Sequence, residues 1–293
     1  DLLVFGTNET SLILNSYMKT VIKGTYTLKI FNIDQDQLYK KKFTFDDPNL
    51  KILSCNQRWW YQKIGSNKVA LVELSLNLFN DCNFPLYPAS IDLIIDSEIF
   101  SNIVFSEVIN PFENKEIRCY IITDINKNQK NFSLFIKDNN DNILSNGTYK
   151  IDITNKIDTK YYNWDYRSYH YQIKLPNLDF LYSYYKEINR INREDYSVYI
   201  FNEYDESFID LISDQINNIS ESFDDIDLIN FAASFVQNLP YKKDSEINDT
   251  FEYPRYPVET LFYNNGCGDC EDKAILLANI LINMDYNICF IKT

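Results

Sequence analysis

Residues 266–272 read Gly-Cys-Gly-Asp-Cys-Glu-Asp, and an apolar run from Ala274 to Met284 follows them. The two glycines allow a tight turn, Asp269 is a natural N-cap, and carboxylates at the next positions favour the positive end of a helix. Apolar residues then recur at three- and four-residue spacing, which predicts a buried helix that starts at this turn. Cys270 would lie at its N-terminal tip, where backbone N–H groups and the helix dipole favour a thiolate.

Carboxylates crowd this thiol. Asp269, Glu271 and Asp272 place up to three negative charges beside Cys270, and like charges oppose thiolate formation. Each such neighbour opposes the thiolate by on the order of 1 kcal/mol at a protein surface. The helix dipole acts in the other direction with a similar magnitude. We therefore expect the pKa of Cys270 to stay close to that of a free thiol.

Two further motifs precede the turn. Residues 257–261 read Pro-Val-Glu-Thr-Leu, and Phe235-Val236-Gln237 with Tyr241 marks the end of an earlier apolar helix. In this order, followed by Gly268 to Asp272 and the apolar helix, these motifs resemble the transglutaminase-like superfamily, most closely its microbial and archaeal branch. The resemblance covers about residues 175–293.

The resemblance implies a papain-like α+β domain with a Cys-His-Asp triad, in which Cys270 takes the place of the nucleophile. A thiolate there would attack an amide or ester carbonyl and form an acyl-enzyme, which water or an amine then receives. Hydrolysis of peptide-like bonds is the expected outcome, with no cofactor and no metal. Gly268 and Asp269 belong to the same motif, Asp272 is expected to orient the turn, and Glu259 is expected to hold the preceding loop.

The other two triad members are not matched. The family places its His and Asp a few tens of residues after the Cys on following strands, whereas this sequence ends at Thr293, within a predicted strand over residues 287–292. The single histidine, His170, precedes Cys270 and is expected to be a structural or surface residue. We therefore expect a segment of a longer protein that is inactive by itself. The alternative is a non-catalytic surface protein whose degenerate transglutaminase-like domain serves binding or scaffolding.

The six cysteines, at positions 55, 82, 119, 267, 270 and 289, are scattered and form no disulfide framework. Cys267 and Cys270 form a CxxC pair, which also occurs in zinc and redox sites. A zinc site needs a second pair of ligands, and a thioredoxin-like site needs a preceding strand in a βαβ unit. The sequence supplies neither, so a nucleophilic Cys270 is favoured over both, and over a buried inert thiol.

Composition and charge exclude several classes of protein. The 293 residues suffice for two or three domains, and 45% hydrophobic residues exclude a disordered chain. A net charge of −14 argues against binding to nucleic acid or anionic membrane surfaces. No window approaches the roughly 18 apolar residues of a membrane span, and we expect no signal peptide in the sequence that begins at Asp1. The substrate is expected to be a protein or peptide-like molecule, and a cell-surface or extracellular location is favoured over the cytoplasm.

The first half of the chain has the alternation of β-strands and frequent turn residues. We predict a small β-module over residues 1–64, with a hairpin turn at residues 32–37 and with Trp59 and Trp60 covering its junction. An Ig-like β-sandwich is predicted over residues 65–155, which hold about seven candidate strands.

A Tyr-rich extended connection is predicted over residues 156–175, and the transglutaminase-like domain, incomplete at its C-terminus, over residues 176–293. Helices are expected over residues 205–220 and 224–239. The tyrosines near this connection could hold a glycan or a peptide, but half-buried strand and helix tyrosines are the favoured explanation. The fold class is thus multi-domain, with an all-β N-terminal half and an α+β C-terminal domain.

Overall fold

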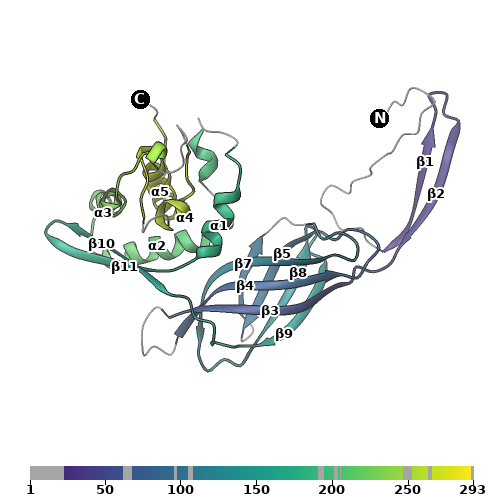
Figure 1. Cartoon of the computed structure of the whole chain (residues 1–293), viewed down its shortest axis with the longest axis horizontal. Coiled ribbons are helices and arrows are strands. Elements are labelled where there is room, and N and C mark those ends of the chain that lie inside the picture. Colours follow the sequence, from purple (N-terminus) through teal and green to yellow (C-terminus); the bar gives the residue numbers. More distant parts are fainter. Residues whose placement is uncertain are drawn as a thin grey trace.

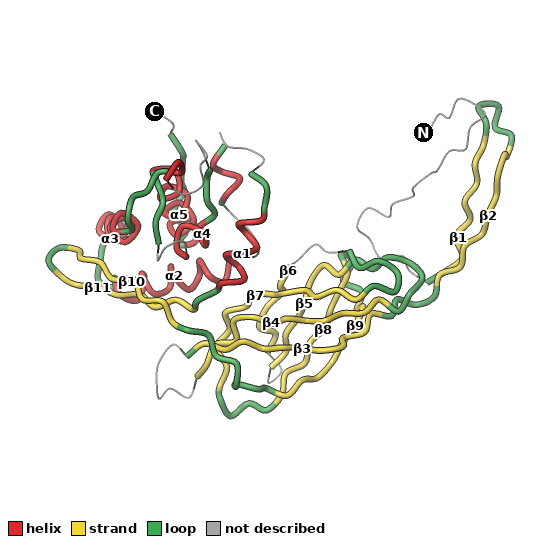
Figure 2. Tube along the Cα trace, viewed as in Figure 1, coloured by secondary structure: helices red, strands yellow, loops and turns green. Residues whose placement is uncertain are grey.

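A computed structural model describes residues 23–61, 68–95, 98–104, 108–190, 195–200, 204, 206–246, 253–262 and 266–291. In these residues a β-rich half precedes a lobe that holds the α-helices (Figure 1, Figure 2). The prediction of a β-rich chain is confirmed, and the structure is compatible with a multi-domain organisation. No helix in the described ranges is long and apolar enough to cross a membrane.

Seven antiparallel strands form a β-sandwich. One sheet has the order β3-β4-β7 and the other the order β6-β5-β8-β9, and the buried side chains of both sheets form one core. Alternate residues of β8 are buried, as expected for a strand with one face in a core. The strands are β3 (Leu50–Trp60), β4 (Lys68–Asn80), β5 (Pro88–Ile95), β6 (Glu98–Val104), β7 (Asn114–Asn126), β8 (Asn131–Asp138) and β9 (Ile143–Lys150).

The predicted boundary at residue 64 differs from the observed sheet. Strand β3 pairs with β4 over its whole length, from Leu50 opposite Asn80 to Trp60 opposite Ala70, so residues 50–60 belong to the sandwich. What remains of the predicted module in the described residues is the hairpin β1 (Gly24–Phe31) and β2 (Gln37–Phe45), which extends away from the sandwich (Figure 1). Residues 1–22 lie outside the described residues.

The beginning of β4 is buried on both faces. Val69 and Leu71 point into the sandwich core, whereas Ala70 and Val72 belong to the core of the helical lobe. Trp59 and Trp60 divide between the two cores in the same way. The two halves of the molecule therefore share a strand.

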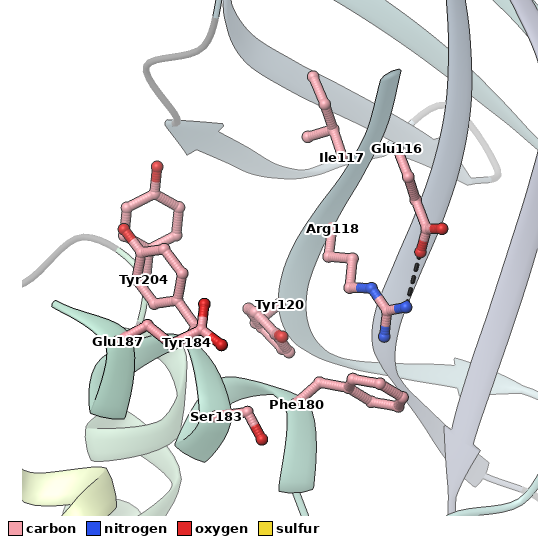
Figure 3. A pocket seen from close by; sticks show the side chains of 9 residues that line it. All are labelled: Glu116, Ile117, Arg118, Tyr120, Phe180, Ser183, Tyr184, Glu187 and Tyr204. Atoms are coloured by element: carbon pink, nitrogen blue, oxygen red, sulfur yellow. Dashed lines mark ion pairs between the residues drawn. The ribbon is translucent and has the colours of Figure 1, made fainter. Parts of the chain in front are cut away.

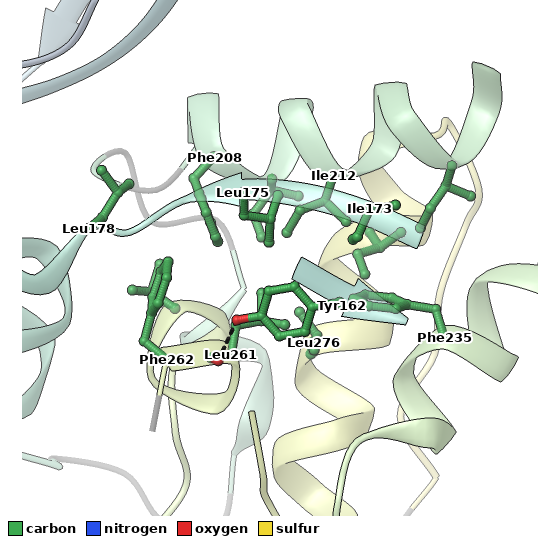
Figure 4. Packing of buried hydrophobic residues seen from close by; sticks show 14 of the residues in the cluster. Tyr162, Ile173, Leu175, Leu178, Phe208, Ile212, Phe235, Leu261, Phe262 and Leu276 are labelled. Carbon is green, nitrogen blue, oxygen red and sulfur yellow. Dashed lines mark hydrogen bonds between the residues drawn. The ribbon is translucent and has the colours of Figure 1, made fainter. Parts of the chain in front are cut away.

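The residues predicted as an extended connection form a hairpin that packs against the helices. Strands β10 (Thr159–Tyr166) and β11 (Tyr169–Pro176) pair antiparallel, and both turn residues between them have a positive φ. Tyr162, Trp164 and Ile173 are buried in the core of the helical lobe. Figure 4 shows Tyr162 and Ile173 in this core. Large aromatic side chains at alternate positions gave this segment enough apolar surface to join a core.

The helices match the predicted ones closely, apart from short additional elements. They are α1 (Asp179–Glu187), η1 (Tyr196–Tyr199), α2 (Glu206–Ile219), α3 (Asp225–Asn238), η2 (Asp244–Glu246), α4 (Pro257–Phe262) and α5 (Cys270–Asn283). Helix α5 packs against α2, α3 and α4, which explains its apolar run. The predicted strand over residues 287–292 is absent from residues 287–291, and Lys292 lies outside the described residues. A strand needs a hydrogen-bonded neighbour, and the described residues do not supply one there.

Candidate active site

Cys270 is the first residue of α5 and its side chain reaches the surface. Asp269 is the N-cap residue, and its backbone N–H donates to the Asp272 carboxylate at 3.3 Å as part of a capping box. Such a box satisfies N–H groups that the helix start leaves without partners. The local sequence thus fixes where the helix begins and which residue stands at its tip.

The two glycines of the turn serve different purposes. Gly266 has φ +95°, a left-handed conformation that side chains disfavour. Gly268 lies so close to the helix start that an added Cβ would stand 2.6 Å from the Cβ of Asp272. The turn therefore needs glycine once for its backbone angle and once for space.

Backbone hydrogen bonds tie the turn to the loops around it. Gly268 forms a parallel bridge with Tyr241, in which the Gly268 N–H donates to Pro240 O at 3.2 Å and Lys242 N–H donates to Gly268 O at 3.2 Å. Cys267 N–H donates to Thr260 O at 2.9 Å. The three motifs that carried the family resemblance therefore meet at this turn.

A buried cation pairs with the start of helix α5. The Arg255 guanidinium pairs with Asp272 and, at 2.9 Å, with Asp244, and the Arg255 N–H donates to Asp272 Oδ1 at 2.8 Å. All three side chains are at most 2% exposed. Burial raises the pKa of Asp272, although the charge of Arg255 opposes that rise. Asp272 thus binds the turn, the helix start and the preceding loop together.

Glu259 forms a second buried pair. Its carboxylate binds the Arg190 guanidinium and accepts hydrogen bonds from Tyr256 N–H at 3.0 Å and from the Tyr253 hydroxyl at 3.3 Å. Arg190 also donates to Pro254 O at 2.8 Å. Burial raises the pKa of Glu259 despite the nearby guanidinium. Through these bonds Glu259 holds residues 253–256, which carry Arg255.

The thiol of Cys270 donates to Glu271 Oε2 at 3.1 Å. This hydrogen bond, then burial, then the charges of Glu271 and Asp269 raise the pKa of Cys270, while the Glu271 backbone N–H lowers it. The acidic neighbours therefore outweigh the backbone effects, in contrast to the balance predicted from the sequence. At neutral pH the sulfur keeps its proton.

Glu271 is itself shifted toward the neutral form. Burial raises its pKa to about 7. Oxygen atoms of Glu271, Asp269 and Asp244 lie within 4.8 Å of one another, which is a spacing that metal ligands can have. Asp244 already accepts from Arg255 and from the Tyr253 N–H, and Glu271 accepts from the Cys270 thiol, so at least two of the three carboxylates are engaged by protein groups. We assign no ion to this cluster.

His170 is the second residue of β11 and lies opposite Asp165 of β10. Its side chain is exposed, and Nδ1 lies 2.9 Å from Asp165 Oδ1. Among the described residues, the hydrogen-bond partner of the Cys270 sulfur is a carboxylate and not an imidazole. His170 is therefore a surface residue, as predicted.

Sequence reasoning missed Arg255, Asp244 and Arg190. The signal for Arg255 was a cation two residues before the Pro-Val-Glu-Thr-Leu motif in a strongly acidic chain. The other two lie far from the motif in sequence and carried no such signal.

Neither a family model nor a curated protein matches this sequence. Solved structures with some similarity include a β-glucuronidase from glycoside hydrolase family 2, at 11% identity and a TM-score of 0.29 over 43% of this chain and 14% of that one. Another is the exo-chitosanase CsxA of Amycolatopsis orientalis, at 6% identity and a TM-score of 0.26 over 86% of this chain and 32% of that one.

A third similar structure is the alkylpurine DNA glycosylase AlkC of Pseudomonas fluorescens, bound to DNA with an abasic site analogue. It has 11% identity and a TM-score of 0.23, over 36% of this chain and 31% of that one. The chain thus spans a third or less of each of these three proteins, and none of them is transglutaminase-like. Similarities of this size carry no argument about the function of the chain.

Proposed function

We propose that this chain carries the nucleophile of a transglutaminase-like cysteine hydrolase or acyltransferase that acts on amide bonds of a protein or peptide-like substrate. The observation that supports it best is an exposed thiol at the first residue of a buried helix, on a turn held by buried ion pairs. A nucleophile must keep its position while the substrate approaches. The turn beneath Cys270 supplies that rigidity.

The chemistry follows from the groups at the helix tip. The Cys270 sulfur attacks the acyl carbon, the thiol proton passes to Glu271, and the carbonyl π electrons move to the oxygen. Backbone N–H groups of the first helical turn, including that of Cys270, stabilise this oxyanion. When the intermediate collapses, the leaving group of an activated ester departs and takes the proton from Glu271, and water or an amine later releases the acyl group.

A carboxylate is a weaker partner for this reaction than an imidazole, because its negative charge keeps the thiol protonated. We therefore expect the 293-residue chain to react with activated esters and to leave amides intact. Amide hydrolysis would require a histidine from residues outside this sequence.

A non-catalytic binding or scaffolding role is the second candidate. The raised pKa of Cys270 and the carboxylate at its sulfur favour it. The two candidates differ in one respect that can be measured, which is whether the helix tip stabilises an oxyanion.

The experiment compares acylation with alkylation at two exposed cysteines. Cys270 and Cys289 are both exposed, and Cys289 lies outside the helix tip. Acylation by p-nitrophenyl acetate develops an oxyanion, whereas alkylation by iodoacetamide does not, and in both reactions the thiol must lose its proton. The ratio of the two rates, followed at each cysteine by mass spectrometry, is therefore insensitive to the thiol pKa.

We expect this ratio to be at least about tenfold higher at Cys270 than at Cys289, since a single oxyanion donor is worth 100-fold or more in a complete active site. Cys289→Ser should leave the acylation of Cys270 unchanged, and Cys270→Ser should remove it. Equal ratios at the two cysteines would favour the non-catalytic candidate.

A further inference from the structure

A cavity of about 390 Å³ lies between the sandwich and the helical lobe (Figure 3). Strand β7 supplies one wall with Glu116, Arg118 and Tyr120, and helix α1 supplies the opposite wall with Phe180 and Tyr184. None of its lining residues takes part in the Cys270 site. Junctions between domains are frequent places for ligand sites.

Aromatic rings dominate the cavity. Tyr184 and Tyr204 lie on one side with their ring centroids 4.9 Å apart, Phe180 lies on the other, and Tyr120 lies between them (Figure 3). Phe180 and Tyr184 remain 42% and 38% exposed. Aromatic faces that stay in contact with water offer apolar area that a ligand can cover.

The charges at the cavity are largely compensated within the protein. The Arg118 guanidinium lies 3.8 Å from the centroid of the Phe180 ring and binds Glu116 at 2.7 Å. Glu73, behind the wall, is also 3.6 Å from Arg118. The wall therefore carries no excess positive charge with which to hold a phosphate or another anion.

A cationic ligand fits no better. The Arg118 guanidinium lines the cavity and would repel it, and the Phe180 ring already has the guanidinium groups of Arg118 and Arg58 within 5.1 Å. An ammonium ion needs a free aromatic face and acceptor groups.

The polar groups of the cavity suit hydroxyl groups instead. Tyr120 and Tyr204 carry hydroxyls that can donate and accept, and Glu187 carries a carboxylate acceptor. The Ser183 hydroxyl donates to Asp179 O at 2.9 Å and can still accept from a ligand. A sugar ring presents the same combination, because its C–H faces stack on aromatic rings while its rim of hydroxyls donates and accepts. The volume is at the small end of the about 300–1,000 Å³ of ligand pockets, which suits one or two sugar rings.

We propose that this cavity binds a neutral carbohydrate, with Tyr184 stacking on the sugar and Glu187 and Arg118 hydrogen-bonding its hydroxyls. This site is independent of the acyl-transfer function proposed for Cys270. It would place the glycan at the junction of the two halves of the molecule.

The test titrates the full chain with cellotetraose, chitotetraose and mannotetraose by calorimetry, and with choline and a lysine-rich peptide as competing probes. We expect at least one neutral oligosaccharide to bind, with an affinity that changes less than about twofold between low and high salt because no charge is compensated. Tyr184→Ala and Glu187→Gln should each weaken that binding at least tenfold. Tyr169→Ala, which removes a tyrosine that is 68% exposed on the β10–β11 hairpin, is the matched control and should change nothing.

Both test residues lie at the surface of α1, and thermal melts of each variant check that the fold is kept. Glu187→Gln retains the shape of the side chain, so it tests the site even if Tyr184→Ala disturbs the helix. Failure of all three oligosaccharides to bind at millimolar concentration would overturn the proposal. So would preferential binding of choline or the peptide, or binding that neither variant weakens.

Discussion

Asp272 and Glu73 are both buried carboxylates paired with arginines, and their surroundings differ. In the helical lobe, Asp272 is 0% exposed and its partner Arg255 is 2% exposed. In the sandwich, Glu73 is 1% exposed, but its partners Arg58 and Arg118 are 19% and 33% exposed. One carboxylate thus depends on a single enclosed cation, and the other on two cations that water reaches.

The difference indicates which arginines the fold depends on and which can be replaced without a large loss of stability. An enclosed arginine cannot be substituted by solvent, so its loss leaves carboxylates uncompensated in a low-dielectric interior. Where two arginines share one carboxylate, either can compensate for the other. We expect the turn under Cys270 to be the sensitive region and the sheet surface to be the tolerant one.

Replacing Arg255 should have the largest effect. Arg255→Met leaves Asp272 and Asp244 buried without their shared cation, and breaking a buried pair in this way costs about 3–5 kcal/mol. Urea unfolding at pH 7.5 measures the loss. A reduction below about 1 kcal/mol would mean that water enters behind the turn and that the two regions are alike.

Replacing Gly268 should have the second-largest effect on stability. Its added Cβ would meet the Cβ of Asp272 at 2.6 Å, so Gly268→Ala forces the helix start to move and should cost roughly 2–3 kcal/mol. The matched control in the sandwich is Gly147→Ala, where the added Cβ would meet only the side chain of Tyr149. That side chain can rotate, so we expect a loss under about 1 kcal/mol. Equal losses in the same unfolding assay would contradict the rigidity that we assign to the turn.

The third effect depends on pH. The pKa of Glu271 is raised to about 7 in the folded chain, so between its ordinary value and 7 the folded state holds a proton that the unfolded state has released. The free energy of unfolding therefore falls as the pH rises through this window. Glu271→Gln should remove the part of this pH dependence that comes from Glu271. The free energy of unfolding of the variant should exceed that of the parent chain by roughly 1–2 kcal/mol at pH 8 and by little at pH 4.5.

Unfolding curves at pH 4.5 and pH 8 give the comparison, and Glu246→Gln, at an exposed carboxylate, is the control. Asp272 has a raised pKa as well and contributes a fall of the same sign in every variant. Parallel pH profiles for the parent chain and Glu271→Gln would show that Glu271 ionises freely in the folded state.

Much of the fold could be predicted because its signals are local. Periodicity located α2, α3 and the start of α5, and alternation located most strands of the sandwich. The predicted domain boundary at residue 64 was wrong, because the sequence of a turn between two strands does not show whether the strands belong to the same sheet. The β10–β11 hairpin was predicted only as an extended connection, because alternation indicates extended strands but not which other elements they pack against.

The site divides in the same way. Cys270, Gly268 and Asp269 belong to one continuous motif, so the sequence could indicate that they lie together. The Arg255 pairs join residues separated by 11 and 17 positions, and no local pattern encodes such a contact. The direction of the Cys270 pKa depended on where the Glu271 side chain points, and a sequence does not contain that rotamer.

The smallest effect is expected in the sandwich. Arg118 lies 3.6 Å from Glu73, whereas Arg58 binds the same carboxylate at 3.0 Å, so Arg118→Met leaves Glu73 paired. Both arginines are partly exposed, and the loss of a pair of this kind costs at most about 1 kcal/mol. Arg58→Met should cost a similar amount, because Arg118 then remains beside Glu73.

The double variant Arg58→Met/Arg118→Met removes both cations, so that the buried Glu73 carboxylate has no arginine partner from this pair. Its loss should exceed the sum of the two single losses by about 1 kcal/mol or more, since the two arginines compensate for each other. Additive losses would mean that solvent already compensates Glu73 without them. In that case the tolerance of the sheet would come from its exposure to water and not from having two arginines.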